Sequence, residues 1–192
     1  YHESGHALVS AVVNADDRVT KISIVSRGRA GGHTWFVQEE ERRLATKAQM
    51  SARLVSLMGG RAAEQLVAGE PTSGAQDDIE RATAMARRMI TELGMSEKIG
   101  PVSLSLAVPR LLGEAEFMAP YSPDVAAVID HEVRQLLEAA RQEATEVLEE
   151  RRSTLDAIAQ KLLEVESLEG DELDDLLYKG RSDPEKAGVA AS

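Results

Sequence analysis

Apolar side chains follow two different spacings along this chain. In six stretches they recur every three to four positions, which gathers them on one face of a helix. Those stretches are residues 1–14, 46–68, 74–94, 122–150, 151–166 and 171–178. In residues 19–26 and 33–37, apolar and polar side chains alternate and β-branched residues are frequent, which predicts two strands. The expected fold class is therefore mainly α, with a small β-hairpin or sheet.

The same pattern predicts the domain organisation and two local features of the helices. We expect residues 1–178 to form one domain, followed by a disordered tail over residues 179–192, which are polar and aperiodic. Gly59 and Gly60 interrupt a predicted helix and each costs about 1 kcal/mol relative to alanine, so we expect another backbone to pack closely there. Ser73 and Gln76 have capping-box spacing, which predicts a helix start near residue 74.

Residues 1–6 (YHESGH) contain the pattern HExxH at the start of the first predicted helix. His2 and His6 are four positions apart, so both imidazoles lie on one helix face, with Glu3 to one side. This arrangement suits a zincin-type zinc site, in which the glutamate takes a proton from water. The chain has no cysteine, so a third ligand must be a histidine or a carboxylate. Because HExxH also occurs by chance, that third ligand decides the interpretation.

Two neighbouring aspartates near the start of the helix 74–94 fall on different faces. Asp77 aligns with Arg81 on the solvent side, whereas Asp78 aligns with Ala82 and Met89 on the apolar side. An inward carboxylate is unfavourable unless a cation meets it. Favourable interaction with the helix N-terminus is the alternative explanation, and it serves Asp77 better than Asp78. Asp78 is therefore our candidate for the third metal ligand.

Glu64 is the rival of Asp78 on the preceding predicted helix. Its carboxylate has three possible roles: a metal ligand, a partner that orients a ligand histidine, or an ion-pair partner of Arg61. The helix phase does not separate these roles. We prefer Asp78 as the ligand and keep Glu64 as a rival ligand or supporting residue.

The second predicted strand supplies candidate substrate-binding residues. If residues 33–37 form the edge of a sheet near the HExxH helix, an extended peptide can pair with this edge through its backbone. Gly32, His33, Thr34 and Trp35 would then contact the substrate. The alternative is a hairpin that only covers the core.

Charge and hydropathy exclude several classes of function. The net charge is −11, and the acidic excess lies almost entirely in residues 114–192, so we expect no nucleic-acid binding. No apolar run approaches the roughly 18 residues of a membrane span, and no signal peptide is visible. Since the chain begins at Tyr1 inside a motif, we expect a soluble fragment of a longer protein.

Four motifs together resemble one known family. They are residues 1–6 (YHESGH), 59–64 (GGRAAE), 72–78 (TSGAQDD) and 92–96 (ELGMS). In this order they are similar to the peptidase domain of the FtsH family, membrane-anchored and ATP-dependent zinc metalloproteases with a AAA+ motor. The resemblance runs from residue 1 to about residue 177. It implies that His2, His6 and Asp78 bind zinc and that Glu3 is the catalytic base.

The resemblance also implies the setting of this chain. We expect a zinc endopeptidase domain with one zinc per subunit, in a homo-hexamer that receives unfolded polypeptides or membrane proteins from the AAA+ domain. ATP and Mg would be cofactors of the motor alone, and no Walker A sequence occurs in these residues. The parent would be anchored in a membrane with the peptidase domain on the cytoplasmic side. Residues 102–120 are unlike other members.

Two other functions stay open at this point. The chain could be a non-catalytic oligomerisation module with a vestigial metal site, although the intact His2, Glu3 and His6 argue against this. It could also be a stand-alone zinc peptidase that needs no motor. Metal analysis and degradation of an unfolded protein distinguish the first alternative, and the sequence upstream of Tyr1 distinguishes the second.

Overall fold

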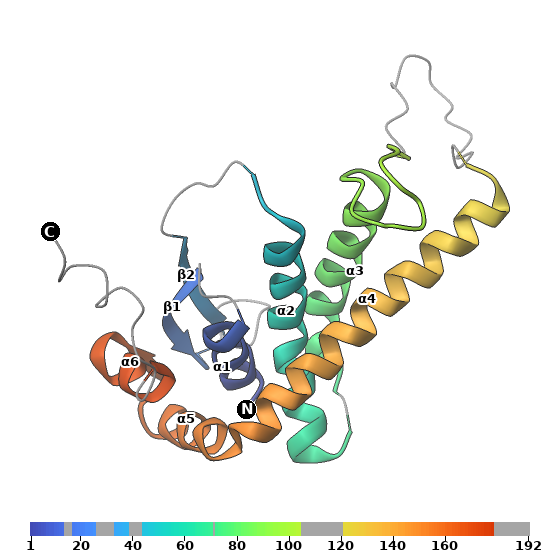
Figure 1. The fold of residues 1–192 in the computed structure, drawn as a ribbon. Helices are drawn as coiled ribbons and strands as arrows, with labels where there is room; N and C mark the ends of the chain where they lie inside the picture. The colour runs from blue at the N-terminus through green and yellow to red at the C-terminus, as the bar shows by residue number, and fades with distance from the viewer. Residues whose placement is uncertain (14–16, 26–32, 39–43, 71, 105–120, 179–192) are drawn as a thin grey trace, which may run out of the picture.

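A layer of helices packed on one small sheet makes up the computed structural model (Figure 1). The structure describes residues 1–13, 17–25, 33–38, 44–70, 72–104 and 121–178. The elements in chain order are α1 (His2–Val13), β1 (Asp17–Ser23), β2 (His33–Gln38), α2 (Lys47–Ala68), the 3-10 turn η1 (Ser73–Ala75), α3 (Gln76–Thr91), α4 (Pro123–Glu150), α5 (Arg152–Val165), β3 (Ser167–Glu169) and α6 (Gly170–Tyr178).

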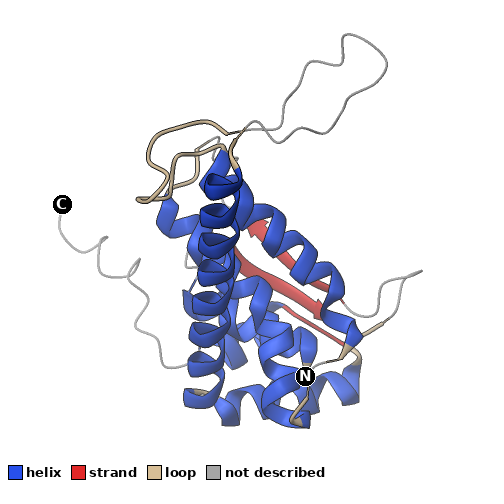
Figure 2. Ribbon diagram, turned by 90° about the vertical axis from the view of Figure 1, so that its right-hand side faces the viewer, coloured by secondary structure: helices blue, strands red, loops and turns tan. Residues whose placement is uncertain are grey.

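Helix α1 occupies the centre of the arrangement. It packs against α2 on one side and against β1 on the other, while α4 runs along α2 and α3 (Figure 1). Figure 2 shows the strands together in one small sheet, with helices making up most of the molecule. Leu8 and Ala7 of α1 are fully buried, because this helix has protein on most of its sides. The first helix, which carries HExxH, is therefore held in the core of the molecule.

Helices α1 and α2 approach each other closely at two glycines. A Cβ atom built on Gly59 would lie 2.8 Å from the carbonyl oxygen of Gly5, and a Cβ on Gly5 would collide with the backbone of Gly59. Only residues without a side chain permit this contact. The close backbone approach that we expected at Gly59 is confirmed.

The ends of the long helices have identifiable caps. At the start of α2, Thr46 and Gln49 form a capping box, and Gly69 ends the helix in the left-handed conformation with φ of 78°. Ser122 caps α4, and Pro123 occupies its first turn. Each side-chain cap contributes about 1 kcal/mol.

Within the described residues, the sheet has three antiparallel strands in the order β2-β1-β3. Strand β1 pairs with β2 in a hairpin that matches Ser23 with His33, and it pairs with β3 so that Ile22 lies opposite Leu168. Strand β2 is at an edge of the sheet, as predicted. The sequence pattern did not predict β3, and it placed β1 about two residues too late.

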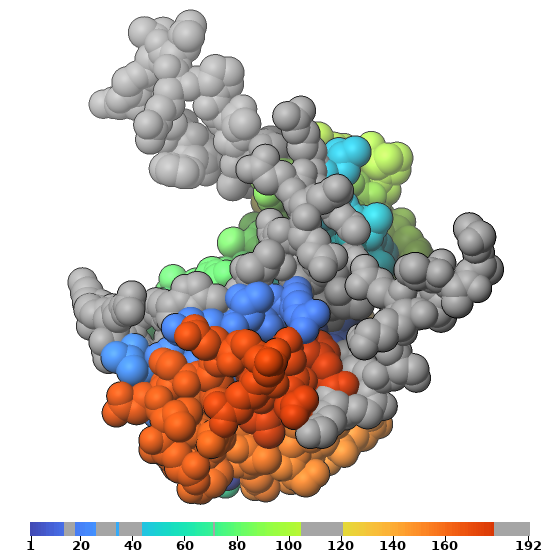
Figure 3. Space-filling view, turned by 90° about the vertical axis from the view of Figure 1, so that its left-hand side faces the viewer, coloured from blue at the N-terminus to red at the C-terminus, as the bar shows by residue number. Residues whose placement is uncertain are grey.

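The C-terminal helices attach to the sheet and to α1. Arg18 of β1 forms a 2.6 Å ion pair with Asp174 of α6, and the Tyr178 hydroxyl accepts a hydrogen bond from the Val19 amide. Figure 3 shows α5 and α6, in orange and red, as one continuous surface beside blue residues of the N-terminal part. The apolar faces of these two helices are buried, with the side chains of Leu155, Ile158, Leu173 and Leu177.

All six predicted helices occur in the described part of the chain, with one correction at the start of α3. Ser73 and Gln76 do not form the predicted capping box. The hydroxyl of Thr72 accepts a hydrogen bond from the Gly74 amide instead, and the turn η1 precedes a helix whose N-cap, Ala75, makes no side-chain cap. The predicted tail, residues 179–192, lies outside the described residues. Within the described helices, none is long and apolar enough to cross a membrane.

Candidate metal centre

Helix α1 brings the two motif histidines together. The Nε2 atoms of His2 and His6 lie 3.0 Å apart, and their rings meet edge to face with a centroid separation of 4.7 Å. Their positions four residues apart account for this contact, because one helical turn separates them. Both side chains are largely buried, His6 with 12% exposed and His2 with 24%.

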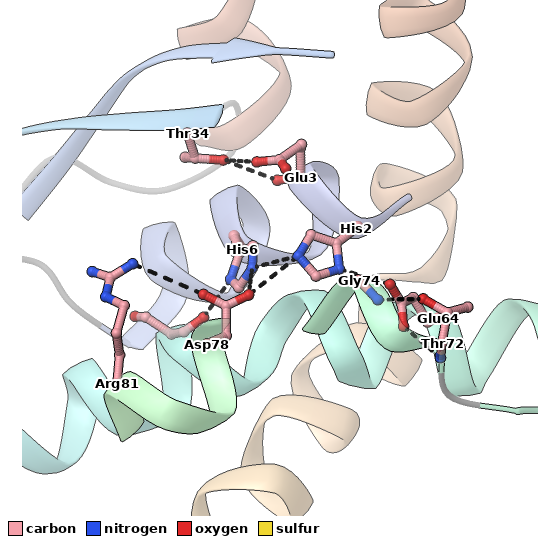
Figure 4. Close-up of polar contacts among 10 residues, drawn as sticks. His2, Glu3, His6, Thr34, Glu64, Thr72, Gly74, Asp78 and Arg81 are labelled. Carbon is pink, nitrogen blue, oxygen red and sulfur yellow. Dashed lines mark hydrogen bonds and ion pairs between the residues drawn. The ribbon is translucent and has the colours of Figure 1, made fainter. Parts of the chain in front are cut away.

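Helix α3 adds Asp78 to this pair (Figure 4). Its Oδ2 atom lies 3.0 Å from Nε2 of His6 and 3.2 Å from Nε2 of His2. The side chain of Asp78 is 14% exposed, whereas Asp77 next to it is an exposed residue. The expected orientation of the two aspartates, drawn from the helix period, is confirmed.

The other nitrogen of each imidazole has its own fixed partner. Nδ1 of His6 lies 2.8 Å from the carbonyl oxygen of Ser56, and Nδ1 of His2 lies 2.8 Å from Oε1 of Glu64. A carbonyl and a carboxylate only accept hydrogen bonds, so each Nδ1 donates. In the neutral rings both Nε2 atoms therefore carry lone pairs, and these point at each other and at Asp78.

Glu64 thus contacts the side of His2 that faces away from Asp78. Its second oxygen, Oε2, accepts a hydrogen bond of 3.0 Å from the Thr72 amide, so the segment before α3 fixes the carboxylate (Figure 4). Among the described residues, the group that could hold a metal ion consists of His2, His6 and Asp78. Of the partners considered for Glu64, the one that its Oε1 atom contacts in the structure is the imidazole of His2.

The three converging atoms create a site that favours positive charge. Burial alone would raise the pKa of Asp78, but both imidazoles donate hydrogen bonds to its carboxylate when they are protonated at Nε2, and these bonds outweigh burial and hold that pKa well below its usual range. Burial would lower the pKa of His2, yet contacts with Asp78 and Glu64 raise it above its ordinary value. Two nitrogen acceptors and one carboxylate oxygen within 3.2 Å of one another can hold a divalent cation.

Glu3 has a different environment from the histidines beside it. The hydroxyl of Thr34 on β2 donates a 3.0 Å hydrogen bond to its Oε2 atom. In Figure 4 the carboxylate of Glu3 points towards β2, on the opposite side of the imidazoles from Asp78. The sheet, and not a second helix, holds this carboxylate.

The remaining candidates for substrate binding are only partly described. His33 and Trp35 belong to β2, so their backbone lies along the edge strand. Gly32 lies outside the described residues. Thr34 is close to the site, but its hydroxyl contacts Glu3.

Sequence reasoning missed two contributors to the site and anticipated a third in part. The Ser56 carbonyl leaves no sequence signal, because every residue carries a backbone oxygen. Thr72 belongs to the motif of residues 72–78, but the sequence indicated no role for it. Gly60 was marked by the glycine pair, although its neighbours turn out to be the two imidazoles and not a backbone.

Comparison with known proteins identifies the family. The sequence model of Peptidase family M41 matches residues 1–176. The ATP-dependent zinc metalloprotease FtsH 3 of Symbiobacterium thermophilum is 46% identical over 92% of this chain and 29% of its own length. The FtsH proteins of Mycobacterium bovis and Thermomicrobium roseum are 48% and 45% identical over 92% and 98% of this chain, and over 23% and 29% of their own lengths. The chain, which spans less than a third of these relatives, therefore belongs to Peptidase family M41 as a peptidase domain of the FtsH type.

Proposed function

We propose that this chain is the zinc-dependent endopeptidase domain of an ATP-dependent, membrane-anchored protease. His2, His6 and Asp78 hold the zinc, and Glu3 is the general base. The relatives named above are ATP-dependent zinc metalloproteases, and the model of Peptidase family M41 matches residues 1–176 of this chain.

One observation carries this proposal: three acceptor atoms from α1 and α3 converge with separations of 3.0–3.2 Å. Zinc binds nitrogen and oxygen at about 2.0–2.1 Å in tetrahedral sites, so its ligand atoms stand roughly 3.3–3.4 Å apart. The three side chains therefore fit the group with little adjustment. The Ser56 carbonyl and Glu64 orient the two imidazoles, as partners of metal-binding histidines commonly do.

The proposed chemistry is hydrolysis of a peptide bond. Zinc supplies Lewis acidity, which makes water acidic enough to act as a nucleophile near neutral pH. Glu3 accepts a proton from the attacking water while the water oxygen bonds to the scissile carbonyl carbon. Glu3 then returns that proton to the amine nitrogen as the carbon–nitrogen bond breaks. The hydrogen bond from Thr34 keeps the carboxylate at its position between these two transfers.

Substrate presentation follows from the edge position of β2. An extended polypeptide pairs with a strand at the edge of a sheet mainly through backbone hydrogen bonds. Such pairing depends little on the side chains of the polypeptide, so we expect low sequence specificity. We propose that unfolded polypeptides and membrane proteins are the substrates and that the backbone of residues 33–35 takes part in this pairing. A AAA+ domain of the parent protein, in a homo-hexamer with the peptidase domains on the cytoplasmic side, delivers them.

The test uses the full-length protein and the substitution Glu3→Gln, with Glu149→Gln on the exposed surface of α4 as the matched control. We expect Glu3→Gln to keep its zinc content and lower ATP-dependent casein degradation by about 10²–10⁴-fold, the usual contribution of a general base. Full activity of Glu3→Gln would refute the role of Glu3. Activity that survives complete removal of zinc by a chelator would refute the proposed function as a whole.

A further inference from the structure

The two adjacent glycines of α2 face different neighbours. A Cβ atom on Gly59 would meet the Gly5 oxygen at 2.8 Å, the Gly5 carbonyl carbon at 3.0 Å and the His6 Cα at 3.2 Å, all of them backbone atoms of α1. A Cβ atom on Gly60 would meet only imidazole atoms among its three nearest neighbours: Nε2 of His6 at 2.5 Å, and Cε1 and Nε2 of His2 at 2.6 and 2.7 Å. Gly59 therefore serves the contact between two helices, whereas Gly60 makes room for two rings.

The atoms beside Gly60 are the ones that face Asp78. Both Nε2 atoms would be in contact with a methyl group at this position, although non-bonded heavy atoms prefer separations of about 3.5–4.0 Å. A methyl group would therefore displace the rings by roughly 1 Å. Metal sites tolerate deviations of only about 0.2 Å in their ligand distances. The rings can rotate away from a methyl group, but they cannot do so and still converge on Asp78.

We infer that Gly60 is a positioning residue for the metal: the absence of its side chain lets both imidazoles stand with their Nε2 atoms against Asp78. This inference rests on the proposed function, since it concerns the same site. It separates two roles that the glycine pair would otherwise share. Gly59 contributes to the stability of the fold, and Gly60 contributes to the affinity for zinc.

The experiment compares Gly60→Ala with Gly59→Ala in the full-length protein. Zinc affinity is measured by competition with a chromophoric chelator, and the Tm is measured on the zinc-free proteins. We expect Gly60→Ala to weaken zinc binding by about 10–100-fold or more, the range known for changes next to metal ligands. Its zinc-free Tm should match or slightly exceed that of the wild type, because alanine favours the helix.

Gly59→Ala should show the opposite pattern. Its methyl group meets backbone that cannot rotate away, so we expect the zinc-free Tm to fall by roughly 2–12 °C. Below its Tm this variant should lose less zinc affinity than Gly60→Ala, because its methyl group meets the backbone of α1 and leaves the space beside both Nε2 atoms unchanged. Equal zinc affinity of Gly60→Ala and the wild type would overturn the inference. A wild-type protein that binds no zinc would instead overturn the proposed function.

A further variant covers the case in which Gly60→Ala unfolds. The same substitution is then made in a protein whose His2 and His6 are both alanine, which gives the new methyl group its space. Recovery of the Tm in this background supports a clash with the rings. Unfolding that persists there would show that Gly60, like Gly59, serves helix packing, and the inference would be wrong.

Discussion

The two halves of the proposed active site are held in different ways. On the metal side, His2 and His6 are fixed at both ring nitrogens, by Asp78 and by partners from α2. On the base side, Glu3 receives a hydrogen bond from Thr34 of an edge strand. The first half is thus built between three packed helices, and the second half is built between a helix and the rim of a small sheet.

This difference matches the demands of the two tasks. Metal ligands need one fixed geometry, which helices packed at glycines provide. A general base accepts a proton from the attacking water and then donates it to the leaving amine. Its carboxylate must therefore reach both of these atoms in turn. A single hydroxyl partner restrains such a group less than two buried ring contacts do. Three substitutions test this contrast, from the largest expected effect to the smallest.

Asp78→Asn should have the largest effect, because it removes the negative charge of the metal-binding group. We expect zinc affinity to fall by more than about 100-fold, since changes beside ligands already cost roughly 10–100-fold. Asp77→Asn is the matched control: the same substitution on the exposed neighbour should leave zinc content unchanged. Equal losses in the two variants, measured by elemental analysis, would contradict the assignment of Asp78 to the site.

Glu64→Ala should have an intermediate effect. Its removal leaves Nδ1 of His2 and the Thr72 amide without their described partner, so His2 loses its orientation but remains a ligand. We expect zinc affinity to fall by about 10–100-fold. Glu80→Ala, an exposed residue of α3, serves as the control in the same chelator competition. A loss as large as that of Asp78→Asn would favour Glu64 as a direct ligand.

Thr34→Val should have the smallest effect, on the base side alone. The loss of one hydrogen bond worth about 1 kcal/mol should lower kcat by roughly 3- to 10-fold, with KM and zinc content unchanged. Thr34→Ser keeps the hydroxyl and should retain most of the activity. If Thr34 acts instead by binding substrate, Thr34→Val will raise KM and leave kcat unchanged. The effect should also disappear when Glu3 is already glutamine.

The helices, and the side chains that meet at the proposed metal site, could be predicted from the sequence because both depend on the helix period. The spacing of His2 and His6, and the opposite faces of Asp77 and Asp78, depend only on positions within single helices. The role of Glu64 depends instead on a distance between two helices, so the helix period leaves its three possible roles open; in the structure Oε1 lies beside Nδ1 of His2.

Two other features escaped prediction for physical reasons. Strand β3 has three residues, too few for an alternating pattern to be recognised, and its strand character comes from pairing with β1. A capping box was predicted at the wrong helix. Thr46 and Gln49 have the same spacing as Ser73 and Gln76, yet only the first pair forms a capping box. The local tertiary setting, in which Thr72 contacts Glu64, decides between them.

Strand β3 also limits how far this protein can be shortened from its C-terminal side. It covers the edge of β1 that β2 does not, and Leu168 is buried opposite Ile22. A chain cut before Ser167 would uncover that edge and the apolar groups beneath α6, which invites pairing between separate molecules and aggregation. Expression of a shorter protein should therefore retain α6 to Tyr178, even though the proposed metal ligands lie in the first 78 positions.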